Sequence, residues 1–183
     1  MNFENIRPPR EIPYYDQQGG LITSIRNGAK SRGIHPVRYA FRRFKNYLLL
    51  MLAYFSPVNR ARVALHRWRG VNIGKNVYIG MLCFLDNAYP EYIYLEEDCS
   101  INAGTMIIAH FNLKSHFKNI IPAMAEPVII KKGAILAVRS IVLPGVTVGT
   151  CSIVSAGSVV NRSVPDYTLV AGNPAKKVTT LKV

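Results

Sequence analysis

From Ile130 to Val164 an aliphatic residue recurs at every sixth position of the chain. The members of this first row are Ile130, Leu136, Val142, Val148, Val154 and Val160. A second row runs beside it through Ile129, Ile135, Ile141, Ile153 and Val159, with Thr147 at its one polar position. A step of six is a multiple of the two-residue period of a strand and does not fit the 3.6-residue period of a helix. The pattern therefore predicts a short strand and a tight turn, repeated, with one face always directed inward.

The same rhythm begins at Gly70 and is interrupted twice. The interruptions, residues 87–92 and 111–127, are polar and contain proline, so they are expected to form loops, where functional residues concentrate. The sequence thus divides into an N-terminal arm with helices over 1–69, a repeat domain over 70–178 and a tail over 179–183.

The region before the repeat predicts an arm followed by helices. Residues 1–35 are rich in Pro, Gly and polar residues, which indicates an extended arm with a short helix near 21–26. Pro36 suits the start of a helix and Pro57 its end, and a second helix is expected over 59–68. These helices and the C-terminal tail could cap the two ends of the repeat, since each repeat is stabilised only by its neighbours.

The first of these helices contains a wholly apolar run, residues 47–55, with arginines and lysines on both sides. The run is too short to span a bilayer, which takes about 20 residues. A basic-flanked apolar helix can lie in a membrane interface. It can equally pack against its own protein or in an oligomer, and the sequence leaves both interpretations of residues 36–69 open.

Composition indicates a globular chain with a basic N-terminal third. Of 183 residues, 49% are apolar and 18% charged, and the net charge is +13. Residues 1–70 hold 13 of the 23 Lys and Arg and only three acids, which indicates an anionic partner or a solvated basic face. No nucleic-acid-binding module is recognisable, so nucleic acid is not expected as a partner. Three cysteines without a C-x-x-C pair, and no signal peptide, predict a cytoplasmic protein.

Three motifs carry a resemblance to a known family. They are Val142–Gly149 (VLPGVTVG), Ser155–Val160 (SAGSVV) and Val170–Lys176 (VAGNPAK). Together they resemble the hexapeptide-repeat sugar O-acetyltransferases over about residues 70–178. Pro90-Glu91 with Ile93 is most similar to the capsule, colanic acid and exopolysaccharide members. The Asn-Phe-Asn segment of the maltose and galactoside enzymes is absent, and Met81-Leu82-Cys83 stands near its place.

The resemblance implies an all-β repeat fold, a left-handed parallel β-helix with three hexapeptides per coil. It also implies a homotrimer with active sites between subunits and acetyl-CoA as co-substrate. If three hexapeptides close one coil, residues 18 apart stack, so that Ile130 lies on Val148 and Leu136 on Val154. Each stacked side chain that is buried contributes about 1.5–3 kcal/mol.

Acetyl transfer to a hydroxyl needs a base, and histidine is the usual one. His110 lies where the repeat gives way to the second loop, the place that the catalytic histidine occupies in the family. Asp86, at the edge of the first loop, could orient His110, contact a sugar hydroxyl, or simply be solvated beside a turn. Asn87 and His116 are further candidates for contacting the acceptor.

The resemblance also suggests which residues contact acetyl-CoA. Small residues match the family's contact positions on the coil, and basic residues match positions near the phosphates of the cofactor. The candidates are Ala137, Val138, Ala156 and Gly157 on the coil, and Arg162 and Lys176 for the phosphates.

The expected function is acetyl-CoA-dependent O-acetylation of a sugar in a cell-surface or exported glycan or its precursor, by a cytoplasmic protein whose contact with the inner face of the membrane is left open. Two alternatives remain open, N-acylation of a nucleotide-linked amino sugar and a non-enzymatic repeat scaffold. Because the same fold hosts zinc enzymes that need three converging histidines and the repeat offers no third one, no metal is expected.

Overall fold

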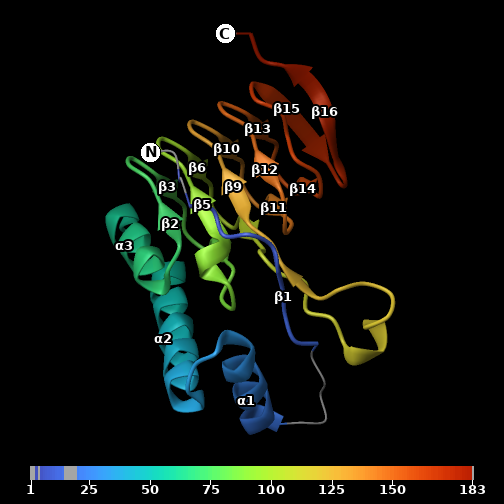
Figure 1. Cartoon of the computed structure of the whole chain (residues 1–183). Helices are drawn as coiled ribbons and strands as arrows, with labels where there is room; N and C mark the ends of the chain where they lie inside the picture. The colour runs from blue at the N-terminus through green and yellow to red at the C-terminus, as the bar shows by residue number, and fades with distance from the viewer. Residues whose placement is uncertain (1–2, 4, 15–19, 183) are drawn as a thin grey trace.

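The computed structural model describes residues 3, 5–14 and 20–182, and it shows a three-sided coil of parallel strands with helices along one end (Figure 1). Three helices precede the coil: α1 (Gly20–Arg32), α2 (Pro36–Phe55) and α3 (Asn59–Arg69). Helix α1 is longer than the short helix expected near 21–26, whereas α2 begins at Pro36 as predicted, with the His35 side chain accepting from the Val37 amide.

Short parallel strands form the three sides of the coil. The first sheet contains β2 (Asn72–Ile73), β5 (Ile93–Leu95), β9 (Val128–Ile130) and β12 (Thr147–Val148). The second contains β3 (Tyr78–Ile79), β6 (Ser100–Ile101), β10 (Ile135–Leu136) and β13 (Ile153–Val154). The third contains β4 (Phe84–Leu85), β7 (Met106–Ile107), β11 (Ile141–Val142) and β14 (Val159–Val160). The chain visits the three sheets in turn, so each coil takes one strand from each side.

The first row of the six-residue pattern fills the interior. Ile130 pairs with Val148, Leu136 with Val154, and Val142 with Val160, which is the predicted 18-residue stacking. All six members are at most 1% exposed, whereas Ile135 of the second row is 38% exposed. The inward and outward faces of the strands are therefore those that the sequence predicted.

Close stacking of the coils requires glycine at certain turns. A Cβ added at Gly80 would lie 2.5 Å from the amide nitrogen of Ala103 in the next coil. No side chain fits at that distance, so the glycine sets how closely these two turns approach.

Different elements cover the two ends of the coil. Helix α3 packs against β2 and β3 at the first coil. At the other end β15 (Thr168–Gly172) extends the second sheet in parallel, and β16 (Ala175–Thr180) pairs with it antiparallel. Strand β16 thus continues two residues into the segment expected as a tail, where Thr180 pairs with Thr168.

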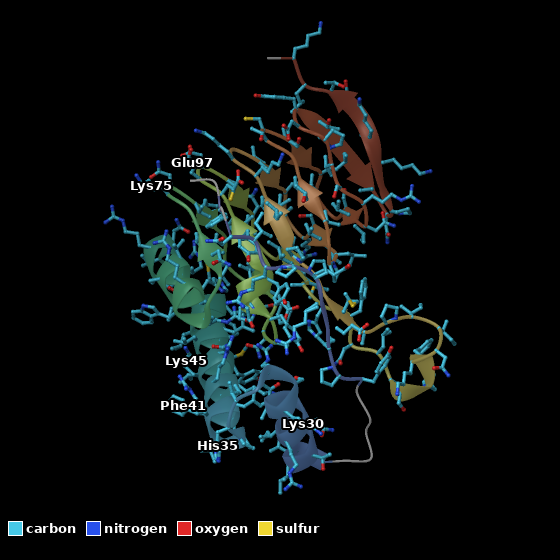
Figure 2. All side chains as sticks on the ribbon, viewed as in Figure 1. Lys30, His35, Phe41, Lys45, Lys75 and Glu97 are labelled. Carbon is cyan, nitrogen blue, oxygen red and sulfur yellow. The ribbon has the colours of Figure 1, made fainter. Side chains whose placement is uncertain are left out.

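Helix α2 has one buried and one exposed apolar face. Asn46, Leu50 and Ala53 are buried against the rest of the chain. The outer face carries an apolar stripe at spacings of three and four residues, in which every side chain is 48–71% exposed: Val37, Phe41, Phe44, Leu48, Leu52 and Phe55. Figure 2 shows Phe41 with Lys45 on the side of α2 away from α1. No helix in the described part of the chain is long and apolar enough to cross a membrane.

The two loops and the N-terminal arm meet beside the third sheet. The first loop contains the short helix η2 (Pro90–Tyr92), and the second contains η3 (Ser115–Phe117) and β8 (Met124–Ala125). Strand β8 pairs with β1 (Arg10–Glu11) of the arm on one side and with His110 on the other. The arm therefore closes over the region where the chain leaves the coil.

Candidate active site

His110 and Asp86 lie at the same corner of consecutive coils. Asp86 follows β4 and His110 follows β7, and these strands pair through Leu85 and Ile107. The His110 Nδ1 and the Asp86 Oδ2 are 2.5 Å apart. The register of the coil thus brings together two residues that are 24 positions apart in the sequence.

Asp86 is enclosed and fully hydrogen-bonded. Its side chain is 1% exposed, and its Oδ1 accepts from the amides of Ala88 and Tyr89 at 2.8 and 3.0 Å. Its Oδ2 accepts from the amide of Ala109 at 2.8 Å as well as from His110. Of the interpretations that the sequence left open, a solvated carboxylate is wrong, because the turn closes over the side chain and its amides replace water.

These hydrogen bonds keep Asp86 charged. Burial by itself raises the pKa of a carboxyl group, but the hydrogen bond and charge of His110 and the amides of Tyr89 and Ala109 outweigh it and lower the pKa of Asp86. A carboxylate can only accept, so Nδ1 of His110 donates to it and Nε2 is the nitrogen left to accept a proton. The pair has the geometry of a general base and the group that orients it.

Arg69 stabilises the backbone of this corner through hydrogen bonds, a role that the sequence analysis did not identify. It is 2% exposed, and its Nη2 donates to the carbonyls of Leu85 and Asp86, each at 2.8 Å. In the sequence it reads only as one basic residue among several at a helix end, because its burial depends on α3 packing against the coil.

A pocket of about 760 Å³ opens beside His110. Its walls come from α1, α2, both loops and the N-terminal arm, and Asn87 is among the lining residues. His116 is not among them, since its ring packs on Phe117 in η3 with 4.3 Å between ring centroids. Of the two further acceptor candidates, the structure therefore brings only Asn87 to the pocket.

Most residues suggested for acetyl-CoA gather at a different corner, between the second and third sheets. Ala137 and Val138 follow β10, Ala156 and Gly157 follow β13, and the Gly157 amide donates to the Val138 carbonyl at 3.0 Å. A Cβ added at Gly157 would meet no atom within 4 Å, so this corner is open.

The two basic candidates for the phosphates lie at different corners. Lys176 lies on β16 opposite Ala171, and the adjacent Gly172 amide donates to Ser158 at the corner that holds Gly157. Arg162 instead follows β14, at the corner that holds His110. Within one chain, the residues of the predicted site therefore lie at two different corners of the coil.

No protein-family model matches the chain. Over 137 residues it is 28% identical to a putative acetyltransferase of Bacillus subtilis, covering 74% of this chain and 76% of that protein. Over 108 residues it is 33% identical to a putative acetyltransferase of Staphylococcus aureus, covering 59% of this chain and 54% of the relative, so it spans about half of the staphylococcal protein. A third match is 48% identical over only 48 residues, to the dTDP-3-amino-3,6-dideoxy-alpha-D-galactopyranose 3-N-acetyltransferase of Aneurinibacillus thermoaerophilus, of which it covers 25%.

The fold is shared with a hexapeptide-repeat acetyltransferase of Vibrio cholerae that was crystallised with acetyl-CoA. The TM-score is 0.67 at 23% identity, over 83% of this chain and 96% of that one. The chain is thus similar in sequence to putative acetyltransferases and in fold to a hexapeptide-repeat acetyltransferase. This finding confirms the predicted resemblance and, with it, the acetyltransferase class. A maltose O-acetyltransferase of Clostridium difficile has the same fold, with a TM-score of 0.56 at 20% identity over 79% of this chain and 88% of that one.

No group of three or more His, Cys, Asp or Glu in the described ranges is arranged to hold a metal ion.

Proposed function

We propose that the protein transfers the acetyl group of acetyl-CoA to a sugar hydroxyl of a cell-surface or exported glycan, or of its precursor. The observation that carries the proposal is the His110–Asp86 pair at the edge of a pocket large enough for a sugar. The acetyltransferase class of the relatives supports the reaction type, and the acetyl-CoA in the Vibrio cholerae structure supports the donor.

In this proposal Nε2 of His110 takes the proton of the acceptor hydroxyl as its oxygen forms a bond to the thioester carbonyl carbon. The carbon–sulfur bond then breaks, and the CoA sulfur leaves with the proton that His110 holds. Asp86 stabilises the protonated ring in between, since its carboxylate stays ionised and hydrogen-bonded to Nδ1.

We further propose that three chains assemble around left-handed coils, so that each active site lies between two of them. The division of the site supports this arrangement, because the corner with Gly157 and Lys176 is not the corner with His110 and Arg162. A neighbouring chain that presents its Gly157 corner to His110 would complete the site.

We also propose that the apolar stripe of α2 contacts the cytoplasmic face of the cell membrane. Arg38 and Lys45 are exposed, and each follows a residue of the stripe by one position, so both lie beside the stripe on the helix, which suits an anionic lipid surface. The protein should therefore co-sediment with vesicles containing phosphatidylglycerol, and Phe41→Ser with Phe44→Ser should abolish this. Val178→Ser is the matched control, as Val178 is 59% exposed on β16. Loss of trimerisation instead of vesicle binding would show that the stripe packs between subunits.

N-acylation of an amino sugar is the second candidate, and the 48-residue match to a sugar N-acetyltransferase favours it. His110 could take a proton from an amine as well as from a hydroxyl, so the site does not separate the two. Incubation with acetyl-CoA and fractionated envelope glycans and nucleotide sugars, followed by mass spectrometry, would identify the product. Mild alkali removes an O-acetyl ester and leaves an amide.

The general base is tested by His110→Ala. Turnover should fall by roughly 10²–10⁴, because proton transfer by a positioned base contributes about that factor. Melting temperature, oligomeric state and acetyl-CoA binding should stay unchanged. Near-normal turnover of the folded variant would refute the assignment.

A further inference from the structure

We propose that the pocket beside His110 binds an acceptor that carries a phosphate group, with Arg43 and Arg42 of α2 holding the phosphate and Asn46 the sugar. The proposal rests on the proposed function, since it names the acceptor class of that site.

Three arginines line the pocket, Arg32, Arg42 and Arg43, and no Asp or Glu is among the lining residues. The carboxylate of Glu91, which is not a lining residue, forms ion pairs with both Arg32, at 2.5 Å, and Arg42, at 3.1 Å. It supplies one negative charge to the two arginines. In the described part of the chain no carboxylate pairs with Arg43, whose guanidinium donates to Ser24 at 3.2 Å. The three arginines therefore carry two positive charges that the Glu91 carboxylate does not neutralise.

A phosphate ester carries nearly two negative charges at neutral pH, and a diphosphate diester carries two. Guanidinium groups bind phosphate oxygens through paired, charge-assisted hydrogen bonds. The excess charge of the pocket thus matches a phosphate better than it matches a carboxylate with one charge. A neutral sugar would leave both charges without a partner.

The wall also holds two buried polar atoms with no hydrogen-bond partner in the described structure, Oδ1 of Asn46 and Nε of Arg32. Asn46 is 3% exposed and lies on α2 one turn after Arg42 and Arg43. A buried acceptor without a donor is costly, so such atoms usually meet a ligand or water. A sugar hydroxyl in the pocket would supply the missing donor to Asn46.

Aromatic contacts connect this wall to the base. The Arg32 guanidinium lies 4.3 Å from the centroid of the Tyr89 ring, and the rings of Tyr89 and His110 are 5.1 Å apart between centroids. The arginines and His110 therefore belong to one continuous surface. An acceptor held by its phosphate on α2 would present a sugar hydroxyl toward His110.

The phosphate could belong to a soluble nucleotide sugar or to a sugar carried on a lipid phosphate. Binding is therefore measured by calorimetry in two arms on the full-length protein. One arm uses glucose 1-phosphate and UDP-glucose, with glucose and glucuronate as neutral and carboxylate controls. The other uses phosphatidylcholine vesicles with and without a polyprenyl diphosphate-linked sugar. The arm with tighter binding identifies the source of the phosphate.

Arg43→Ala should weaken binding of the phosphorylated probes by about 10- to 100-fold. Arg43→Lys should restore part of it, and Arg26→Ala should leave it unchanged, because Arg26 is an exposed arginine of α1 outside the pocket lining. Glucose should not bind measurably, and glucuronate should bind more weakly than glucose 1-phosphate.

Three results would overturn the proposal: no phosphorylated probe binds in either arm, glucuronate binds as well as glucose 1-phosphate, or Arg43→Ala weakens acetyl-CoA binding as much as it weakens probe binding. The last would assign the arginines to the donor. These binding measurements need no turnover, so they test the phosphate site independently of the proposed acetyl transfer. If only the proposed function were wrong, phosphate binding would persist without acetyl transfer.

Discussion

Asp86 accepts one hydrogen bond from the ring of His110 and three from backbone amides of the turns on either side. The amides of Ala88 and Tyr89 come from its own turn, as aspartate often arranges after a strand. The amide of Ala109 comes from the next coil, so one carboxylate ties two coils together beside the base. The local sequence favours the turn, whereas the contact with His110 exists only because β4 and β7 are in register.

Asp86→Asn should reduce turnover by roughly 10–10³ while leaving the KM for acetyl-CoA unchanged. An amide offers one acceptor oxygen where the carboxylate offers two, so His110 loses its partner or meets an N–H group, and its protonated form is no longer stabilised. Steady-state kinetics measures this, with the melting temperature as a check on the turn. A variant with normal turnover would reduce Asp86 to a structural residue.

At the scale of elements, the six-residue pattern determines which face of each two-residue strand is buried. Leu136 is fully buried and Ile135 is 38% exposed, although the two are neighbours in β10. The alternation follows from the strand period of two. In helix α2 only one of the two apolar faces packs against other residues that the structure describes, so the other apolar face is exposed.

Leu136→Ala should therefore destabilise the protein by about 2–5 kcal/mol, because it leaves a cavity in the stacked interior. Ile135→Ala is the matched control on the outer face and should cost well under half as much. Denaturant unfolding of the two variants measures both values. Equal costs would mean that the outer face of β10 is buried in the assembled protein.

Helix α3 makes stability depend on pH through His66. Burial, and then the charges of Arg69 and Arg62, lower the pKa of His66 to about 3, and its Nδ1 accepts from Arg69 at 2.8 Å. In the unfolded chain the pKa is about 6.5. At pH values between these two pKa values, the unfolded chain binds a proton at His66 and the native protein does not. The contribution of neutral His66 to stability is therefore complete above about pH 6.5 and is lost as the pH falls toward 3.

His66→Gln should lower the melting temperature at pH 7 and make it less dependent on pH between 7 and 4. The glutamine keeps an oxygen that can accept from Arg69 but has no proton to bind. Calorimetric scans of the two proteins across that range provide the comparison. Parallel pH profiles would show that other groups cause the acid instability.

At the scale of the whole molecule, the candidate residues lie at separate corners of the coil. If the site forms between chains, His110→Ala and Val138→Glu inactivate different halves of it. Co-expression should then restore about a quarter of the wild-type activity, because random assembly leaves that fraction of interfaces with both halves intact. Mixing the two purified variants without dissociation is the control and should restore none. No recovery on co-expression would place the whole site within one chain.

The sequence alone determined the repeat, its inward face, the 18-residue stacking, the start of α2 and the place of His110 where the coil gives way to the second loop. These features depend on local periodicity or on short motifs, both of which can be read from neighbouring residues. Only the tertiary structure decided that Asp86 is buried against His110, that Arg69 supports the same turn, and that α1 and α2 build an arginine-lined pocket. Each of these depends on contacts between segments far apart in the chain, and hydrophobic periodicity carries no information about which polar side chains those contacts will enclose.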